Sequence, residues 1–433
     1  AGNALLISPD LLAEEELLIA KELEAKPPFE EGRCDYSRVI PYKEPLFEQA
    51  YQTFRKRRIG ADRFDVFCAS QSEWLDDFSL FVVLKRRFNG QIWNEWPVSL
   101  RDRQGEALQA VEAQCQEELE KVKFLQYLFH KQWSSLKENC NRRGIQLFGD
   151  LPIYVNFDSA DVWANPELFK LDDEKRPSFV SGVPPDYFSP TGQLWGNPVY
   201  QWERLRETGF EWWIRRMAHH LHLFDAARID HFRGLVAYWE VPAGEKTALN
   251  GKWVDAPVND LFGALFKRFF HLPIIAEDLG VITPDVREVL YRYGFPGMKI
   301  LLFAFGEDHP MHPYLPHTYT ENSLVYTGTH DNNTARGWFE KEASPDDRRR
   351  LFRYLGKVVP AEEIHWDLIR LAIGSVAKTV LFPMQDVLGL GEEGRMNRPA
   401  TTWGNWEWRL RPDQIIPADL AKLSEMTEIY GRG

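Results

Sequence analysis

The chain has few cysteines and no long apolar run, and each of these features argues against certain kinds of protein. Only four cysteines occur in 433 residues, and no two of them form a Cys-x-x-Cys pair. This argues against a disulfide framework and a zinc site, and it favours a reducing compartment. No apolar stretch reaches the roughly 18–20 residues of a membrane span, and no signal peptide is visible. We therefore expect no membrane partner and a cytoplasmic location, or the plastid stroma in a plant.

Basic residues are in the minority, and phosphate-binding glycine motifs are missing. There are 52 Lys and Arg against 64 Asp and Glu, which gives a net charge of −12. Nucleic acids and anionic membranes need basic patches, so we expect neither as a partner and predict a neutral or cationic substrate. Neither a Gly-x-Gly-x-x-Gly motif nor a P-loop occurs, which argues against a nucleotide-binding doubly wound sheet.

Aromatic residues, by contrast, are plentiful: 16 Trp, 15 Tyr and 28 Phe. Many stand beside polar residues and glycine, as in "YFSPTGQLWGNPVY" and "TTWGNWEW". The simpler interpretation is that they are large core residues, since aromatic side chains mainly supply buried area. The alternative is that some form flat apolar platforms with polar neighbours, which suits sugar rings. Composition alone leaves both open.

Two regions differ in their hydrophobic pattern. Residues 1–140 are predicted to be mainly helical, and residues 141–433 to alternate between strands and helices, with loop insertions at about 157–200 and 236–260. Apolar residues at three- and four-residue spacing predict the helices of the first region. They are expected at about 9–26 after the Ser8-Pro9 cap, after Pro45, at 73–88 and at about 106–140.

After residue 144, short apolar runs alternate with amphipathic stretches such as 257–270 and 283–294. This alternation predicts parallel strands joined by crossover helices. Four runs end in acidic residues, and a (β/α)8 TIM barrel keeps its chemistry at the carboxyl ends of its strands, so we favour that fold. The six runs are 145–155, 222–230, 271–280, 297–305, 322–331 and 378–386, and their acidic ends are Asp230, Glu277-Asp278, Asp331 and Asp386.

The run "FDAARIDHFRG" ends in an unusual concentration of charge. Arg228 and Asp230 are two residues apart on a predicted strand, so both side chains point to one face. The guanidinium keeps the aspartate ionised, which suits a nucleophile rather than a proton donor. A structural Arg–Asp pair is the alternative. His231 and Arg233 follow on the emerging loop.

Other strand ends offer further polar groups. Apolar neighbours favour the protonated form of Glu277, as a general acid requires, although Asp278 could be the inward residue instead. His330 and Asp331 mix donors and acceptors suited to sugar hydroxyls, and no third metal ligand stands out. A further strand end is surrounded by Asp150, Asp158 and Asp161, of which at least one is expected to be a helix cap or loop residue.

Two carboxyls of opposite character, with a third beside them, are the equipment of retaining glycosidic chemistry. One carboxylate attacks the anomeric carbon while the other protonates the leaving oxygen, at a separation of about 5–5.5 Å. We therefore expect the three carboxyls Asp230, Glu277 and Asp331 to converge on one pocket. The third would hold sugar hydroxyls as the ring flattens.

Several long blocks resemble one known family. They are "GDLPIYVNFDSADVW", "VPPDYFSPTGQLWGNPVY", "RIDHFRG", "YWEVPAGEKTALNGKW", "AEDLGVITPDV", "GFPGMKILLFAFG", "TGTHDNNT" and "RMNRPATTWGNWEWRL". The chain resembles the amylomaltases or disproportionating enzymes, 4-α-glucanotransferases of glycoside hydrolase family 77 in the α-amylase-like clan. The resemblance extends over essentially the whole chain. It implies a retaining (β/α)8 enzyme that moves segments of α-1,4-glucans between maltooligosaccharides or starch chains.

The resemblance also implies roles for particular residues. Asp230 is similar to the nucleophile, Glu277 to the general acid/base and Asp331 to the transition-state stabiliser. No cofactor and no metal are implied. The substrate-binding residues expected from it are Arg228, His231, His330, Asp150, Tyr187, Phe188, Trp195 and Asn197, with Tyr187, Phe188 and Trp195 on a mobile loop over the cleft.

The six predicted strands are too few to close a (β/α)8 barrel, which needs eight. We therefore expect the first two barrel strands to be missing from this chain and to be supplied before Ala1. An α-glucan hydrolase is the nearest alternative activity, and a non-catalytic glucan-binding protein is the alternative from another class. The sequence decides neither the oligomeric state nor the ratio of transfer to hydrolysis.

Overall fold

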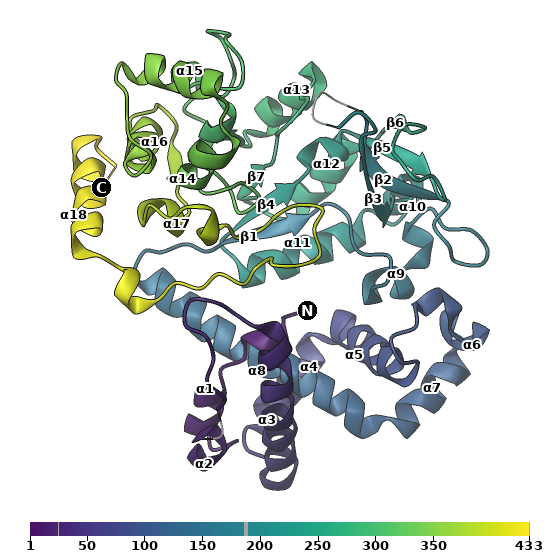
Figure 1. Ribbon diagram of the computed structural model, residues 1–433. Helices are drawn as coiled ribbons and strands as arrows, with labels where there is room; N and C mark the ends of the chain where they lie inside the picture. The colour runs from purple at the N-terminus through teal and green to yellow at the C-terminus, as the bar shows by residue number, and fades with distance from the viewer. Residues whose placement is uncertain (25, 186–188, 433) are drawn as a thin grey trace. The chain divides into compact units, whose positions relative to one another are not determined.

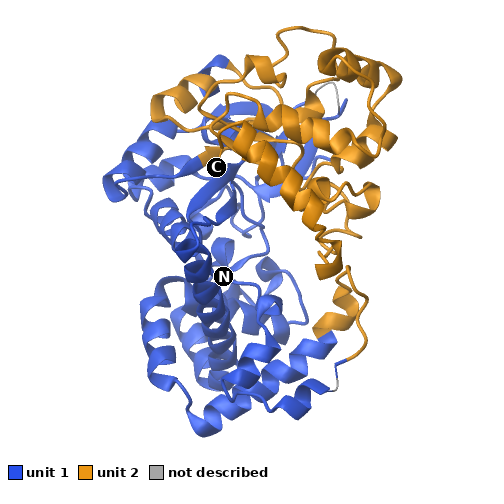
Figure 2. Ribbon diagram, turned by 90° about the vertical axis from the view of Figure 1, so that its left-hand side faces the viewer, with its two compact units in different colours: residues 1–26, 41–274, 284–286 blue, residues 27–40, 275–283, 287–433 orange. Residues whose placement is uncertain are grey.

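The computed structural model describes residues 1–24, 26–185 and 189–432 (Figure 1). The chain divides into two compact units, shown in different colours in Figure 2. Unit 1 comprises residues 1–26, 41–274 and 284–286, and unit 2 comprises residues 27–40, 275–283 and 287–433.

The residues that precede the first strand are helical, as the sequence predicts. The helix at Ser72–Arg87 confirms the prediction for 73–88. The helices of this region are α1 (Pro9–Glu14), α2 (Ala20–Glu24), α3 (Tyr36–Arg57), α4 (Ala61–Ser70), α5 (Ser72–Arg87), α6 (Val98–Arg101), α7 (Gly105–Gln114) and α8 (Gln116–Arg142).

Two of the predicted helix extents are wrong because the chain turns where the apolar spacing continues. The stretch at 9–26 is broken at Glu16, whose positive φ of 59° turns the chain so that Leu17 and Leu18 enter a core. The stretch at 106–140 is broken at the buried Cys115. Helical periodicity records which face is buried, and it does not register a turn that keeps that face inward.

The predicted start of the helix after Pro45 is also wrong. Helix α3 already begins at Tyr36 and passes through both Pro41 and Pro45. Each proline removes one backbone donor inside the helix, which normally kinks or ends it. Burial of Leu46 and Phe47 directly after them offsets this cost, because each fully buried large apolar side chain contributes about 1.5–3 kcal/mol.

All six predicted strands are present, and they form one sheet in the order β1-β4-β7-β8-β9-β10, with β1 and β10 at its ends. The pairs β1–β4, β7–β8, β8–β9 and β9–β10 are parallel. In β1–β4, Asp150 stands opposite Arg228. The strands are β1 (Phe148–Pro152), β4 (Ala226–Asp230), β7 (Ile274–Ala276), β8 (Gly297–Ile300), β9 (Ser323–Tyr326) and β10 (Thr379–Leu381).

Helices lie between these strands in the chain, as the alternation predicts. The amphipathic stretches at 257–270 and 283–294 form α12 (Val258–Arg268) and α13 (Pro284–Tyr293). The others between strands are α9 (Ala160–Ala164), α10 (Trp202–Glu207), α11 (Glu211–Leu223), α14 (Ala335–Gly337), α15 (Pro345–Leu355) and α16 (Ile364–Ile373). Helices α17 (Met384–Val387) and α18 (Pro417–Ile429) follow β10.

The two predicted loop insertions contain a second sheet, which the sequence analysis missed. It is antiparallel, and its strands follow the order β3-β2-β5-β6. Its short strands carry aromatic, glycine and polar residues without a clear alternation, so their pattern resembles a loop. They are β2 (Phe179–Val183), β3 (Gln193–Pro198), β5 (Ala237–Pro242) and β6 (Lys252–Asp255).

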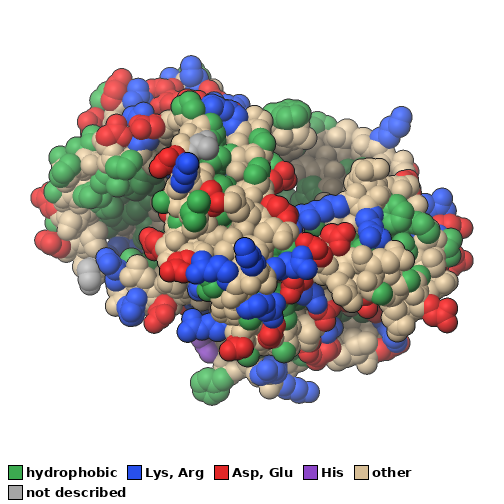
Figure 3. Space-filling model, turned by 90° about the horizontal axis from the view of Figure 1, so that it is seen from below, with side chains coloured by type: hydrophobic (Ala, Val, Ile, Leu, Met, Phe, Trp, Pro, Cys, Tyr) green, Lys and Arg blue, Asp and Glu red, His purple; other side chains and the backbone are tan. Residues whose placement is uncertain are grey.

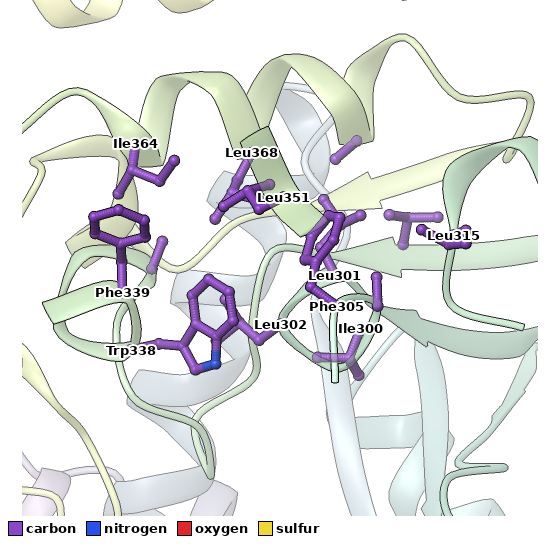
Figure 4. Close-up of a cluster of buried hydrophobic side chains, with 14 of the residues drawn as sticks. Ile300, Leu301, Leu302, Phe305, Leu315, Trp338, Phe339, Leu351, Ile364 and Leu368 are labelled. Carbon is purple, nitrogen blue, oxygen red and sulfur yellow. The ribbon is translucent and has the colours of Figure 1, made fainter. Parts of the chain in front are cut away.

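Each unit has an apolar core of its own. In unit 1, helices α3, α4 and α8 bury an aromatic cluster in which Phe54 and Phe124 stack at 4.6 Å. In unit 2, a large cluster collects side chains from β8, β9, α15 and α16. Figure 4 labels Leu351 and Leu368 among its members. The core of unit 2 holds β8 and β9 in place, and β9 leads into the loop of Asp331 discussed below.

The distribution of charge on the surface and the hydropathy of the helices agree with the amino-acid composition. Figure 3 shows Lys and Arg side chains interspersed with Asp and Glu on the face seen from below. Within the described part of the chain, no helix is both long and apolar enough to span a bilayer.

Candidate active site

The end of β4 carries three charged side chains in direct contact. Arg228 Nη1 lies 2.6 Å from Asp150 Oδ1, and Arg228 Nη2 lies 2.9 Å from Asp230 Oδ1. Arg228 is largely buried, whereas the two carboxylates are substantially exposed. A planar guanidinium can hold two carboxylates in fixed directions because its donors form a rigid fork. The predicted common face of Arg228 and Asp230 is therefore confirmed.

Local sequence explains why Asp150 stands opposite Arg228. Its neighbour Gly149 packs against the ring of Phe224, and a Cβ at this position would come within 2.2 Å of that ring. Only glycine allows β1 to lie this close to the segment that leads into β4. The parallel register then places Asp150 directly across from Arg228.

His231 follows β4 in a left-handed backbone conformation, with φ of 51°. Burial, together with the nearby charge of Arg233, lowers the pKa of His231 to about 4. The imidazole is therefore neutral near pH 7, so it can donate or accept hydrogen bonds without adding a charge. The ring of Trp195 meets it edge to face, with centroids 4.7 Å apart.

Strand β3 supplies the remaining residues predicted for unit 1. Trp195 is part exposed, and Asn197 Nδ2 donates to the carbonyl oxygen of Val155 at 3.2 Å. Asn197 thereby ties β3 to the segment after β1. Tyr187 and Phe188, predicted to contact substrate, lie outside the described residues.

Two of the acidic residues around β1 have structural contacts or positions. Asp158 forms an ion pair with Lys85 at 2.7 Å and accepts a hydrogen bond from the Trp93 N–H. Asp161 lies in the first turn of α9, where a negative charge is favourable. The expectation that at least one of these acids is a loop or helix-terminus residue is confirmed.

In unit 2, the neighbours Glu277 and Asp278 have different surroundings. Asp278 Oδ1 accepts the N–H of Met298 at 2.6 Å, and a Cβ on Gly297 would come within 2.4 Å of its carboxylate. Burial raises the pKa of Asp278 to about 6. Asp278 therefore braces the start of β8. Glu277, which directly follows β7, accepts the N–H of Leu279 at 3.0 Å through Oε1.

Asp331 lies five residues beyond β9, in a loop that a dense set of contacts holds in place. Asn397 Nδ2 donates to Asp331 Oδ1 at 2.7 Å, and His330 Nε2 lies 3.2 Å from Asp331 Oδ2. Arg395 Nη2 donates to the Asp331 carbonyl oxygen at 3.2 Å. Both the backbone and the carboxylate of Asp331 are therefore oriented by residues more than sixty positions away.

Three residues beside this loop were not singled out from the sequence: Arg395, Asn397 and Trp406. The Trp406 ring lies 5.1 Å from the His330 ring. All three belong to the block "RMNRPATTWGNWEWRL". Its mixture of arginine, asparagine and tryptophan was the available signal, but the pattern alone did not say which residues face Asp331.

Asp386 was predicted at the end of the last strand, and this placement is wrong. Strand β10 ends at Leu381, and Asp386 lies on α17. It is 1% exposed, accepts the N–H of Ala335 at 2.7 Å and also bonds the Thr327 hydroxyl. Burial raises the pKa of Asp386 to about 6. It connects α14 to the end of β9, so its role is structural.

The structure thus forms two groups of predicted residues. Unit 1 brings together Asp150, Arg228, Asp230, His231 and Trp195, and unit 2 brings together His330 and Asp331. The convergence of Asp230, Glu277 and Asp331, and the carboxyl separation of about 5–5.5 Å, stay predictions. Among the described residues, no group of three or more His, Cys, Asp or Glu side chains has an arrangement that could hold a metal ion.

Comparison with known proteins gives matches along the whole chain. A family profile described as 4-alpha-glucanotransferase matches residues 1–415. A 4-alpha-glucanotransferase of Synechocystis sp. is 51% identical over 437 residues, covering all of this chain and 86% of the relative. One of Aquifex aeolicus is 46% identical over 432 residues, with 100% and 86% covered. The solved structure of an amylomaltase from Streptococcus agalactiae in complex with acarbose has a TM-score of 0.96 at 38% identity, covering 100% of this chain and 87% of that one.

Proposed function

Because the chain belongs to the 4-alpha-glucanotransferase family, we propose that Asp230, Glu277 and Asp331 carry out its glucan transfer. The chain is an enzyme with 4-α-glucanotransferase activity, and its substrates are α-1,4-glucans such as maltooligosaccharides and starch chains. What we propose is how its own residues perform that transfer.

Asp230 is the proposed nucleophile. The observation that carries this assignment is its contact with Arg228, which also holds Asp150. The positive charge keeps the Asp230 carboxylate ionised and fixes the direction of its second oxygen. Its side chain is about half exposed, so a substrate can reach it. A fully sequestered Arg–Asp pair would instead have been a purely structural element.

In the first step, Asp230 attacks the anomeric carbon of the donor glucan. The bond between that carbon and the glycosidic oxygen breaks, and Glu277 gives its proton to the leaving oxygen. In the second step, the 4-hydroxyl of an acceptor glucan attacks the same carbon and displaces Asp230, while Glu277 takes the hydroxyl proton. Two inversions retain the α configuration. Support for choosing Glu277 over Asp278 is that Asp278 is committed to the backbone of β8.

Asp331 is the proposed stabiliser of the distorted sugar ring. Asn397 fixes one of its oxygens, and His330 lies against the other. A carboxylate held in this way can accept hydrogen bonds from sugar hydroxyls that strengthen as the ring flattens, because preorganised groups need no reorientation in the transition state. His330 itself offers a further donor to the sugar.

The remaining contacts are proposed on the donor and acceptor glucans. Arg228, His231, His330, Asp150, Tyr187, Phe188, Trp195 and Asn197 are the proposed substrate-binding residues. Tyr187, Phe188 and Trp195 would cover the cleft and exclude water, so that an acceptor hydroxyl outcompetes hydrolysis. The edge-to-face contact between Trp195 and His231 supports a place for this ring beside the β4 end.

The fold is mixed α/β with a parallel half-barrel sheet, consistent with an amylase-like barrel. We propose that the six strands belong to a (β/α)8 barrel, with residues 1–140 as a helical subdomain beside it and 141–433 as the catalytic part. The four cysteines are free, which supports a reducing compartment such as the cytoplasm or the plastid stroma.

Incubation of the protein with maltotriose tests the proposal. Transfer should give a ladder of longer glucans together with glucose and maltose, whereas hydrolysis should give only shorter products. Asp230→Asn should still bind glucan and remain folded, but lose the ladder. A ladder of near wild-type intensity from this variant would contradict the assignment of the nucleophile.

A further inference from the structure

Trp403 is unusually exposed for a tryptophan. Four of the sixteen tryptophans expose more than a third of their surface: Trp195, Trp253, Trp403 and Trp406. Trp195 contacts His231, Trp406 contacts His330, and Arg233 stacks over Trp253 at 4.0 Å. Trp403 is 87% exposed, and its ring contacts no other ring and no cation among the described residues.

We propose that Trp403 is a glucan-stacking platform that favours long donor and acceptor chains over short ones. This inference rests on the proposed function. A flat, rigid ring supplies a large apolar contact at little entropic cost, and the less polar face of a glucose ring fits it. The chain's net charge of −12 and the absence of a cation near Trp403 agree with a neutral ligand.

The turn that carries Trp403 is internally braced. Asn405 Oδ1 accepts the N–H of Arg398 at 2.9 Å, and its Nδ2 donates to the carbonyl oxygen of Thr401 at 3.0 Å. The Thr401 hydroxyl donates to the carbonyl oxygen of Arg398 at 2.7 Å. Ala400 and Gly404 adopt positive φ angles of 62° and 76° to close the turn. A platform that is already ordered loses little freedom when a ligand binds.

Both ends of this turn stand on the loop of Asp331. Before the turn, Asn397 donates to the Asp331 carboxylate. After it, the ring of Trp406 lies against His330. Trp403 and Trp406 are three positions apart in the sequence, so their Cα atoms are at most about 11 Å apart. Trp403 therefore stands within reach of a glucan that Asp331 holds.

A second segment holds the far side of the turn. Residues 32–36 pair with residues 406–409: the Cys34 N–H donates to the Glu407 carbonyl oxygen, and the Arg409 N–H to that of Gly32. The Tyr36 hydroxyl donates to the carbonyl oxygen of Trp406 at 2.7 Å. Arg33 adds an ion pair with Glu407. Trp403 is thus presented by a fixed support and its exposure does not reflect a loose chain end.

The position of Trp403 determines which glucans gain binding energy from contact with its ring. A short glucan fills the places around the reacting bond and does not extend as far as Trp403, whereas a longer chain does. Binding energy from such a remote contact helps to hold the reacting sugar in place, so it raises kcat/KM for long substrates selectively.

The test compares Trp403→Ala and Trp403→Phe with the control Tyr291→Ala. Tyr291 is 90% exposed on α13, a helix that lies outside the Asp331 loop and the Trp403 turn. Rates are measured with maltotriose and maltoheptaose, and binding of maltoheptaose is followed by calorimetry. We expect kcat/KM for maltoheptaose to fall five- to tenfold more than that for maltotriose in Trp403→Ala. Trp403→Phe should restore most of the difference, and Tyr291→Ala should leave the ratio unchanged.

The outcomes separate this inference from the proposed function. A normal ladder in Trp403→Ala with an unchanged ratio and unchanged maltoheptaose binding would overturn the platform. Weaker maltoheptaose binding in Trp403→Ala would support it even if the unsubstituted protein hydrolysed maltotriose without transfer, which would contradict the proposed function alone. Equal losses in Trp403→Ala and Trp403→Phe, with a lowered melting temperature, would mean that the ring is structural.

Discussion

The two groups of site residues are built in different ways. At the end of β4, Asp150, Arg228 and Asp230 are held by strand geometry: a two-residue spacing along one strand and the register with its neighbour. Around Asp331, orientation comes from Arg395 and Asn397, which are 64 and 66 residues away in sequence. Local geometry is visible in a sequence, whereas long-range support is not. The first group should therefore tolerate changes in distant loops, and the second should not.

The largest expected effect is that of Asp230→Asn. Removing the nucleophilic charge should lower kcat about 10³-fold or more, since the covalent step has no substitute. Glucan binding, measured by calorimetry, and the melting temperature should stay close to those of the unsubstituted protein. The matched control is Asp225→Asn. Asp225 directly precedes β4, at the end of the strand opposite to Asp230, and its carboxylate accepts the Leu147 N–H. A Asp230→Asn variant within a few-fold of full activity would mean that another carboxylate attacks.

Glu277→Gln should cost about 10²–10⁴-fold in kcat, because the leaving oxygen loses its proton donor. Here the leaving group decides the size of the loss. A donor whose leaving group needs no protonation, such as a glycosyl fluoride, should recover part of the rate in the first step. If such a donor gave no recovery, Glu277 would have a role other than proton transfer.

Acid should affect the two units in opposite directions. Burial lowers the pKa of His130 to about 4 and that of His219 to about 3, so unit 1 has stability that is present above about pH 6.5 and is lost as the pH falls through 4. In unit 2, burial raises the pKa of Asp278 and Asp386 to about 6. The stability from these carboxyls is present below about pH 4 and is lost as the pH rises through 6.

For His130 and for Asp386, each shift corresponds to about 3 kcal/mol in the free energy of unfolding, and the two shifts act in opposite directions as the pH falls. Hydrogen exchange measured by region at pH 7 and pH 5 separates them. Peptides from α8 and α11 should lose protection at pH 5, and peptides from α14 and α17 should gain it. His130→Gln should reduce the response of α8, and Asp386→Asn should reduce that of α14 and α17, because His219 and Asp278 still titrate in these variants. Parallel changes in both regions would contradict this account.

Features that depend on local spacing could be predicted from the sequence, whereas features that depend on distant partners could not. The six strands, helix α5 and the Arg228–Asp230 pair were predictable because period-two and helical spacing follow directly from strand and helix geometry. The breaks at Glu16 and Cys115 and the antiparallel sheet were not, since each depends on partners distant along the chain. Asp386 shows the same limit: an acid after an apolar run can serve chemistry or bind a helix start, and only its contacts with Thr327 and Ala335 decide.

Asn397→Ala probes the long-range support directly. It removes one charge-assisted hydrogen bond to the Asp331 carboxylate, a contribution of about 1.5–3 kcal/mol, so kcat should fall about 10- to 150-fold. KM should change less, because the loss concerns a contact that strengthens in the transition state. Asn405→Ala is the matched control: it is an asparagine in the same segment whose side chain bonds Arg398 and Thr401 within the turn. Equal losses of kcat in both variants would show that the turn, and not the bond to Asp331, matters.

The smallest expected effect concerns Trp195 and the choice between transfer and hydrolysis. Each site group pairs a histidine with a part-exposed tryptophan: Trp195 with His231 at 4.7 Å, and Trp406 with His330 at 5.1 Å.

Trp195 lies on β3 in the region predicted to cover the cleft, where an apolar ring would keep water from the glycosyl-enzyme. Trp195→Ala should therefore raise the ratio of hydrolysis to transfer two- to threefold, measured as glucose released per ladder product from maltotriose. Trp195→Phe should keep the ratio low, since a phenyl ring still excludes water. Replacing Tyr187 and Phe188 with Ala should act in the same direction. If the ratio stays constant while KM rises, these rings bind sugar but do not exclude water from the glycosyl-enzyme. The ratio of transfer to hydrolysis would then not depend on the rings that cover the β4 group.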